Sequence, residues 1–242
     1  MDDYESLSHT KWECKYHVVF IPKCRRKVLY AELRPYLGEV FRKLAIQKES
    51  RIEEGHVRVL FDGIPAPVVS AGAQSVIAVV PYSMGGVSET RVRLEYQGRQ
   101  SDAIHLNMDY TDLGLFTADG FGDGQALAFN ADGSFNAPSN PAAKGSLITL
   151  SGTGEGQTAP PGVDGQVVRD PAPVPVAPIT AKIGGVDAEV VSVSETPGLW
   201  PGMLRVVVRI PDGAPSGGAV PVNLYINPTG DYSQDGVTVA IQ

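Results

Sequence analysis

Four basic residues stand close together near the start of the chain: Lys23, Arg25, Arg26 and Lys27. Lysine and arginine side chains in such a run can contact the phosphate backbone of a nucleic acid. A solvated turn has the same composition, and the net charge of −7 would repel DNA. The run is therefore a candidate DNA contact, and an exposed turn is the favoured alternative.

Other residues that could bind a metal or attack a substrate are sparse. Cys14 and Cys24 lie ten residues apart with His17 nearby, and this spacing lacks the C-x2-C pair of a zinc site. They are expected to be two reduced thiols. His105 lies in the apolar stretch AIHLNM with no serine or cysteine constellation around it. A position on a strand surface is therefore expected for His105.

Three glycine-rich stretches and one tryptophan are further candidate binding sites. GTGEGQT lacks the Gly-Lys-Ser/Thr of a phosphate loop, while DGFGDGQ and NADGSFN lack the spacing of an EF-hand calcium loop. Loops and turns are the expected structures. Trp200, in PGLWPG, is expected to anchor a loop, and a ligand or partner contact is the alternative.

The composition of the chain changes near residue 57. Of 20 Lys+Arg and 27 Asp+Glu in 242 residues, residues 1–56 hold 11 and 9, which leaves 9 and 18 for the rest. The same segment holds both cysteines but only 2 of 19 prolines and 2 of 27 glycines. Such a break marks a domain boundary.

Residues 1–56 have the pattern of a β-α-β unit. CKYHVVFIPK is rich in β-branched and aromatic residues, which favours a strand. From about Arg34, apolar residues recur at three- and four-residue steps through Leu44, which predicts an amphipathic helix. RIEEGHV then reads as extended. This order fits the opening half of a ferredoxin-like sheet.

This segment resembles the N-terminus of the single-tyrosine HUH transposases of bacterial insertion sequences. LSHTKWECKYHVVFIPKCRRKVLY, LRPYLGEVFRKLA and QKESRIEEGHV carry the resemblance over residues 5–57. It implies binding of DNA hairpins as single strands. It also implies cleavage by a tyrosine, with a divalent metal held by a histidine-hydrophobe-histidine motif.

The sequence departs from that family where its metal motif is expected. The nearest remnant is His56-Val57-Arg58, and an arginine cannot ligate a metal because it stays protonated. The family's helix with the nucleophilic tyrosine has no counterpart here, and Tyr82, Tyr96 and Tyr110 lie outside the resemblance. We therefore expect no catalytic residues, no metal site beyond the degenerate remnant His56, and no cofactor, with Mg2+ needed only if transposase activity persists.

Residues 57–242 repeat themselves. DGIPAPVVS recurs as GGVDAEVVS at an offset of 122, and RVRLEY recurs as PVNLYI at an offset of 130. Each copy consists of short alternating stretches separated by Gly, Pro and Asp. This pattern is typical of a β-sandwich. In TRVRLEYQG, the residues Val92, Leu94 and Tyr96 are expected on one face.

The repeats resemble the Ig-like modules of IPT/TIG type found in secreted or surface proteins of soil bacteria. KGSLITLSGTG, AKIGGVDAEV and RIPDGAPSGGAVPVNLYI carry this resemblance. It implies an extracellular, non-enzymatic role in interaction or spacing.

These observations predict a mainly β fold: two Ig-like β-sandwich modules preceded by a small β-α-β fragment of a ferredoxin-like transposase domain. The expected boundaries are 1–56 for the transposase-like segment, 57–118 for an incomplete Ig-like module, 119–145 for a connecting segment and 146–242 for the second module. That module carries a proline-rich insertion, expected to be extended, at 159–178. The first module lacks a leading strand like KGSLITLSGTG, and we expect residues 50–61 to run on as one strand that partly replaces it.

The expected function is a non-catalytic, surface or interaction-type β-sandwich protein that carries a truncated transposase N-terminus, the two parts being joined near residues 56–58. The alternative is a transposase-derived protein that binds single-stranded DNA hairpins. Partners would be single-stranded DNA or an intact transposase copy through 1–56, and a protein or surface partner through the modules. No membrane span or signal peptide is visible, so a cytoplasmic location is expected. The resemblance implies that the parent of residues 57–242 was secreted or on the cell surface.

Overall fold

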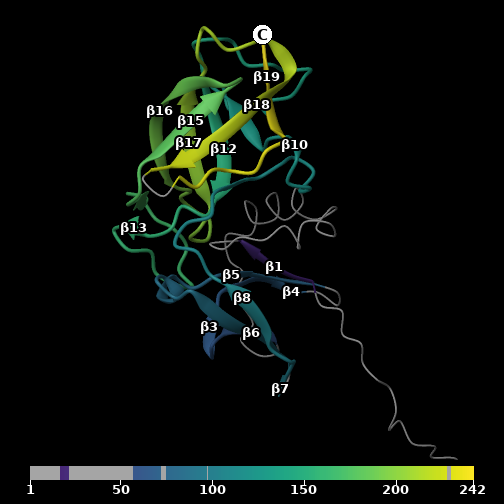
Figure 1. The fold of residues 1–242 in the computed structure, drawn as a ribbon, viewed down its shortest axis with the longest axis vertical. Coiled ribbons are helices and arrows are strands. Elements are labelled where there is room, and N and C mark those ends of the chain that lie inside the picture. The colour runs from purple at the N-terminus through teal and green to yellow at the C-terminus, as the bar shows by residue number, and fades with distance from the viewer. Residues whose placement is uncertain (1–16, 22–56, 72–74, 97, 228–229) are drawn as a thin grey trace, which may run out of the picture.

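The computed structural model describes residues 17–21, 57–71, 75–96, 98–227 and 230–242 (Figure 1). Within these ranges the regular structure is made of strands, apart from one turn of 3-10 helix, η1, at Tyr82–Met84. The expected mainly β fold is confirmed. The helix expected after Arg34 falls outside the described ranges. No helix in the described ranges is long and apolar enough to cross a bilayer.

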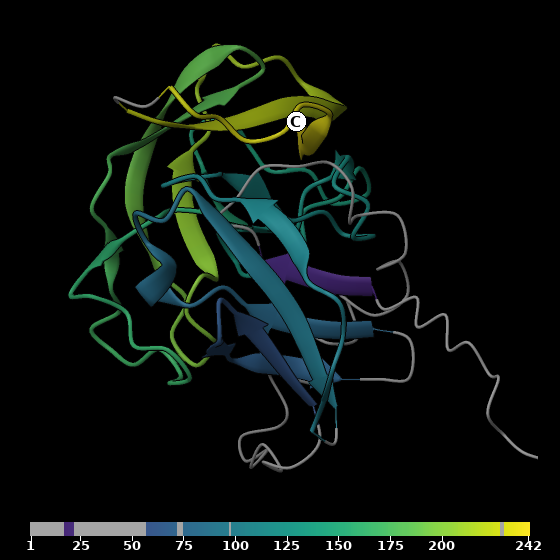
Figure 2. The same cartoon turned by 60° about the horizontal axis from the view of Figure 1, so that its bottom comes forward.

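The first eight strands of the described chain form two small sheets, seen in front in Figure 2. We call these strands the first module. One sheet has the order β1-β5-β4, and the other has the order β3-β2-β6-β7, with β8 also paired to β6. The strands are β1 (His17–Ile21), β2 (Val57–Phe61), β3 (Ile64–Ala66), β4 (Val68–Ala71), β5 (Ser75–Val79), β6 (Glu89–Tyr96), β7 (Arg99–Gln100) and β8 (Ile104–Asn107).

Strand β6 shows why these residues form a sheet over a core. Its side chains alternate: Thr90, Val92 and Leu94 are buried, while Arg91 and Arg93 are exposed. Val92 and Leu94 join an apolar cluster with residues of β2, β5 and η1. Tyr96, expected on the same face, is 47% exposed because it stands at the end of the strand, beyond the core.

The later strands build the larger second module. Nine of them form a curled sheet of order β10-β19-β18-β15-β16-β17-β12-β11, with β9 paired to β12, while β13 and β14 pair with each other (Figure 1). The strands are β9 (Gly114–Leu115), β10 (Gly124–Gln125), β11 (Ala128–Asn130), β12 (Leu147–Thr153), β13 (Thr158–Ala159), β14 (Val174–Pro175), β15 (Ile179–Ile183), β16 (Val186–Glu195), β17 (Leu204–Arg209), β18 (Gly217–Ile226) and β19 (Val237–Ile241).

The core of the second module follows from the same two-residue alternation. In β17, Leu204, Val206 and Val208 are buried while Arg205 and Arg209 are exposed. The buried residues of the sheet's inner face form one apolar cluster. The ribbon of the sheet curls around the side on which these residues lie (Figure 1).

The two modules pair their strands in the same register. On β2 and β6 the Cα partners are Phe61 with Val92 and Val59 with Leu94; on β15 and β18 they are Ile183 with Val222 and Ala181 with Leu224. Between the two modules, the residue numbers of the first partners (on β2 and β15) differ by 122 and those of the second partners (on β6 and β18) differ by 130. These are the offsets of the sequence repeat. The repeat is therefore a repeat of strand pairing as well as of sequence.

An irregularity of the sheet recurs too. The register of β4 on β5 shifts between Val68 and Ser70, and the register of β16 on β17 shifts between Val190 and Ser192. A β-bulge bends and twists its strand, and its position is a defined feature of a fold. The two bulges lie 122 residues apart, at the offset of the repeat. Strand β5 is therefore the equivalent of β17.

Residues 119–145 do more than connect the modules. Strand β10 pairs with β19 and β11 pairs with β12, so the segment adds strands at both ends of the curled sheet. The buried amide of Asn136 fixes it there: its Nδ2 donates to the Ala240 carbonyl at 2.9 Å and its Oδ1 accepts from the Ala240 N–H at 2.8 Å.

The proline-rich stretch 159–178 is held against the rest of the second module. Val168 is buried, and its backbone forms two hydrogen bonds with the turn at 198–199. The Val168 N–H donates to the Leu199 carbonyl, and the Gly198 N–H donates to the Val168 carbonyl. The expected extended linker is therefore a fixed loop, because backbone pairing to a distant turn holds it in place.

Candidate functional site

The sequence-predicted site residues divide into described and undescribed ones. Lys23, Arg25, Arg26, Lys27 and His56 lie outside the described residues, so their roles stay predictions.

Trp200 and His105 lie within the described residues. Trp200 is half-buried and packs, with Leu199 and Phe116, against the buried pair Val79 and Met203. This is a contact between the two modules, since Val79 belongs to β5. His105 is exposed on β8, opposite Arg91.

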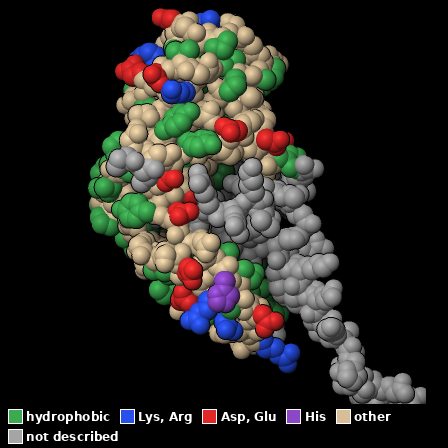
Figure 3. Space-filling model, in the orientation of Figure 1, with side chains coloured by type: hydrophobic (Ala, Val, Ile, Leu, Met, Phe, Trp, Pro, Cys, Tyr) green, Lys and Arg blue, Asp and Glu red, His purple; other side chains and the backbone are tan. Residues whose placement is uncertain are grey.

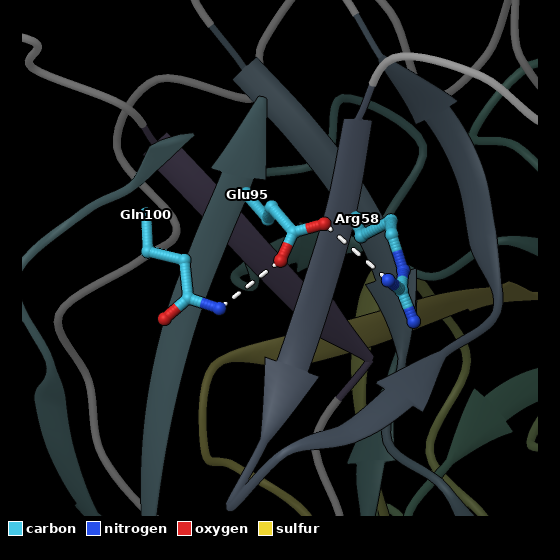
Figure 4. Close-up of polar contacts among 3 residues, drawn as sticks. All are labelled: Arg58, Glu95 and Gln100. Atoms are coloured by element: carbon cyan, nitrogen blue, oxygen red, sulfur yellow. Dashed lines mark hydrogen bonds and ion pairs between the residues drawn. The ribbon is translucent and has the colours of Figure 1, made fainter. Parts of the chain in front are cut away.

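Strands β2, β6 and β7 carry a charged outer face. Glu95 sits at its centre: Arg58 approaches one carboxylate oxygen at 3.3 Å and the Gln100 amide donates to the other at 3.0 Å (Figure 4). The pKa of the Glu95 carboxyl lies below its ordinary value, chiefly because of the Gln100 hydrogen bond and then because of the Arg58 charge. Both contacts favour the carboxylate form.

A second ion pair closes the turn beside this face. Arg91 Nε donates to Asp62 Oδ1 at 3.0 Å. The hydroxyl of Thr90 and the Arg91 guanidinium hold the pKa of Asp62 below its ordinary value. Asp62 has a φ of 47° and Gly63 a φ of 89°, the conformation that Asp-Gly favours in a two-residue hairpin turn.

The charges of this face are mixed. Figure 3 shows basic and acidic side chains intermingled over the first module. Arg58 occupies the position where a second histidine ligand would be expected, and its guanidinium contacts Glu95. A guanidinium stays protonated, so Arg58 cannot take the place of that histidine as a metal ligand.

A buried polar cluster joins the modules where η1 meets the second module. The Tyr82 hydroxyl donates to Glu195 Oε1, which also accepts the Gly202 N–H at 3.0 Å. The Tyr82 N–H donates to Asp164 of the proline-rich loop at 2.8 Å. Gly162 lets this loop pass close to the ring, because a Cβ there would lie 2.2 Å from Tyr82 Cε2.

Two fully buried carboxyl groups face this tyrosine. Glu155 and Glu195 are both 0% exposed. Burial raises the pKa of the Tyr82 hydroxyl far above its ordinary value, and the negative charge of Glu155 and the contact with Glu195 add to the effect. Tyr82 therefore stays protonated and acts as a hydrogen-bond donor. Within the described residues, no group of three His, Cys, Asp or Glu side chains is placed to hold a metal ion.

Sequence reasoning missed this cluster. Tyr82 and Glu195 are 113 residues apart, and neither lies in a recognisable motif. Their one sequence signal is indirect: Glu195 precedes TPGLWPG, the insertion that distinguishes the second repeat from the first.

The edge of β5 is the most unusual feature of the first module. Strand β4 pairs antiparallel with one edge, and β1 pairs parallel with the other, from His17 opposite Ser75 to Ile21 opposite Val79. In the second module, β17 lies in the same way between β16 and β12. Strand β1 therefore occupies the place of the leading strand β12, with the opposite direction.

This arrangement changes one expectation. Residues 50–61 were expected to replace the missing leading strand, but β2, which begins at Val57, belongs to the other sheet and pairs with β3 and β6. The neighbour of β5 is β1. The replacement comes from the first predicted strand of the transposase-like segment.

Comparison with known proteins supports the resemblance of the N-terminal segment to transposases. A family model described as "Transposase IS200 like" matches residues 10–71. Two curated proteins, each named transposase for insertion sequence element IS200, come from Salmonella typhimurium strain LT2 and Salmonella typhi. Each is 43% identical over 76 residues, which cover 29% of this chain and 50% of the relative. No solved structure gives a significant match.

The chain spans about half the length of the curated relatives it matches. Residues 10–71 are similar to IS200-like transposases, and the match runs past the boundary expected at residue 56. It includes β1 and β2, as well as β3 and β4. Beyond residue 71 the described chain consists mostly of strands.

Proposed function

We propose that the chain is a non-catalytic β-sheet protein of interaction type, whose transposase-like segment contributes strands to an Ig-like module. One observation supports this most. Strands β1 and β2 of the matched segment pair with β5 and β6, which both lie beyond residue 71. The segment is thus built into the following sheets, as expected for a fusion that has become one fold.

The chemistry supports the absence of catalysis. A metal site of the histidine-hydrophobe-histidine type needs a second imidazole, and Arg58 stands at that position, paired with Glu95. A guanidinium stays protonated and does not ligate a metal. In this proposal the chain has no cofactor, and its partner is a protein or a surface that the modules bind.

The alternative function is binding of single-stranded DNA hairpins. The observation that favours it is the 43% identity over 76 residues to transposases of the insertion sequence element IS200. In this alternative, Lys23, Arg25, Arg26 and Lys27 contact phosphates, and Mg2+ is needed if cleavage persists.

The test is a titration of the full chain with a single-stranded DNA hairpin, with and without Mg2+, at two salt concentrations. We expect no covalent attachment, no cleavage and no binding at low salt. Binding that weakens as salt rises would favour the DNA-binding alternative, because phosphate contacts release counterions. Cleavage or covalent attachment would overturn the proposal. A variant with Lys23, Arg25, Arg26 and Lys27 changed to Gln identifies the source of any binding.

A further inference from the structure

Strand β5 is buried on both faces. Val76 and Ala78 belong to the core of the first module, and Ile77 and Val79, on the opposite face, are 6% and 5% exposed. Water therefore has little access to the strand. Backbone N–H and C=O groups in such a place need partners along both edges of the strand.

One hydrogen bond fixes the direction in which each backbone N–H of β5 points. The Val79 N–H donates to the Pro67 carbonyl at 2.9 Å, on the β4 side. Successive N–H groups of a strand point to opposite edges. The Ile77 N–H therefore also points toward β4, whereas the N–H groups of Val76 and Ala78 point toward β1.

The equivalent edges of β5 and β17 accept strands of opposite direction. Strand β12 runs antiparallel to β17, and β1 runs parallel to β5. The edge thus selects an extended backbone rather than one strand direction. Strand β1 is also not tied to its neighbours by a tight turn, because residues 22–56 separate it from β2 in the sequence.

We propose that the β5 edge is a strand-acceptor site, filled by His17–Ile21 of the same chain, and that the same segment of a second copy can bind there instead. The backbone contacts are identical in both cases, so exchange between copies costs little beyond the loss of the tether. The proposal rests on the structural role given above to the transposase-like segment. The hairpin titration tests that role separately, since DNA binding does not report on β5.

The first experiment empties the site in the full chain. In Val18→Pro/Val19→Pro, one of the two prolines removes the N–H that faces β5, because adjacent N–H groups point to opposite edges. We expect the amides of Val76 and Ala78 to exchange hydrogen at least about tenfold faster, while those of Ile77 and Val79 keep their protection. The amides of β17 serve as the internal control for folding. Unchanged exchange at Val76 and Ala78 would show that β1 does not fill the edge.

The second experiment fills the site again from outside. A peptide of residues 15–23, KYHVVFIPK, should restore protection of Val76 and Ala78 in the proline variant and should not bind the wild-type chain, whose site is occupied. The same peptide with both valines changed to proline is the matched control. Failure of the valine peptide to protect these amides at about 1 mM would overturn the acceptor site.

A second variant keeps the proposal testable if the proline variant does not fold. Val18 and Val76 are Cα partners, so Val18→Cys/Val76→Cys, in a Cys14→Ser/Cys24→Ser background, places two thiols across the pair. We expect an intrachain disulfide in dilute protein. A disulfide-linked dimer should increase when the chain is refolded at higher concentration. Absence of the intrachain disulfide would refute β1 as the occupant, and absence of the dimer would refute exchange between copies.

Discussion

Changing Tyr82 to Phe tests whether the buried polar cluster holds the modules together. The change keeps the ring, which packs against Gly162, and removes the hydroxyl that donates to Glu195. A hydrogen bond to a charged group contributes about 1.5–3 kcal/mol, and leaving a buried charged acceptor unsatisfied costs at least as much. Glu195 keeps the Gly202 N–H as a donor. We therefore expect the variant to lose about 2 kcal/mol of unfolding free energy.

The pH dependence of the unfolding free energy provides a second test of the role of the Tyr82 hydroxyl. The pKa of folded Tyr82 is raised, while the unfolded tyrosine titrates near 10. Below about pH 10 both states keep the proton, so the hydroxyl adds no pH dependence. Above it, the unfolded state loses the proton first and is favoured by about 1.4 kcal/mol per pH unit. The advantage of the wild type over Tyr82→Phe should therefore shrink as pH rises from 10 to 11.

The assay is urea unfolding at pH 8, 10 and 11, followed by Trp200 fluorescence in a Trp12→Phe background. Trp200 lies in the cluster of Val79 and Met203, so it reports on the same junction. Tyr110→Phe is the matched control, because it removes a hydroxyl from a side chain that is 53% exposed. A difference between wild type and Tyr82→Phe below about 0.5 kcal/mol at pH 8, or a difference that stays constant up to pH 11, would refute the reasoning.

Three further predictions follow from other parts of the structure. Gln100→Ala and Arg58→Gln should each raise the pKa of Glu95 toward its ordinary value, because the Gln100 hydrogen bond and the Arg58 charge both lower it. NMR titration of the Glu95 carboxyl measures both shifts, and an unchanged or lower pKa in either variant would contradict this. Asn136→Ala should cost about 1–3 kcal/mol in urea unfolding, because it leaves the buried N–H of Ala240 without its acceptor, while the Ala240 carbonyl keeps the Ala142 N–H as a donor. Asn223→Ala, whose side-chain contacts are long at 3.5 Å, is the control, and equal losses would count against the argument. Gly154→Ala should disrupt the β9–β12 contact, because the added Cβ would lie 1.7 Å from the Asp112 carbonyl oxygen. The control Gly124→Ala has a similar positive φ but no atom within 4 Å of the added Cβ, so it should cost only about 1 kcal/mol. Thermal unfolding measures both variants, and similar melting temperatures would refute the clash.

Much of the β architecture is readable from local pattern. The alternation of Val92 and Leu94 with Arg91 and Arg93 predicts which face of β6 is buried, since successive side chains point to opposite faces. The Asp62-Gly63 pair predicts a tight hairpin turn because both residues tolerate a positive φ. The repeat offsets likewise carry the pairing register, because the hydrophobic pattern of a strand allows one register to bury its apolar face.

The sequence also identified the transposase-like segment and the arginine at the expected metal-ligand position. It did not identify where that segment goes. Strand β1 has the composition of a strand in any sheet, and its pairing with β5 depends on an edge that is open after β4, β5 and the core are formed. Pairing between strands that lie far apart in the sequence leaves no local signature. The sequence pattern therefore predicted that β1 lies in a ferredoxin-like sheet within residues 1–56 instead of beside β5.

The junction shows the same limit more sharply. By itself the sequence determined the strands, the turns and the repeat, because alternation and glycine act within a few residues. The tertiary structure alone decided that Tyr82 meets Glu195 and that Trp200 packs on Val79. These contacts join residues more than a hundred positions apart. Their partners are chosen by how two folded sheets meet, and no property of either side chain encodes that choice.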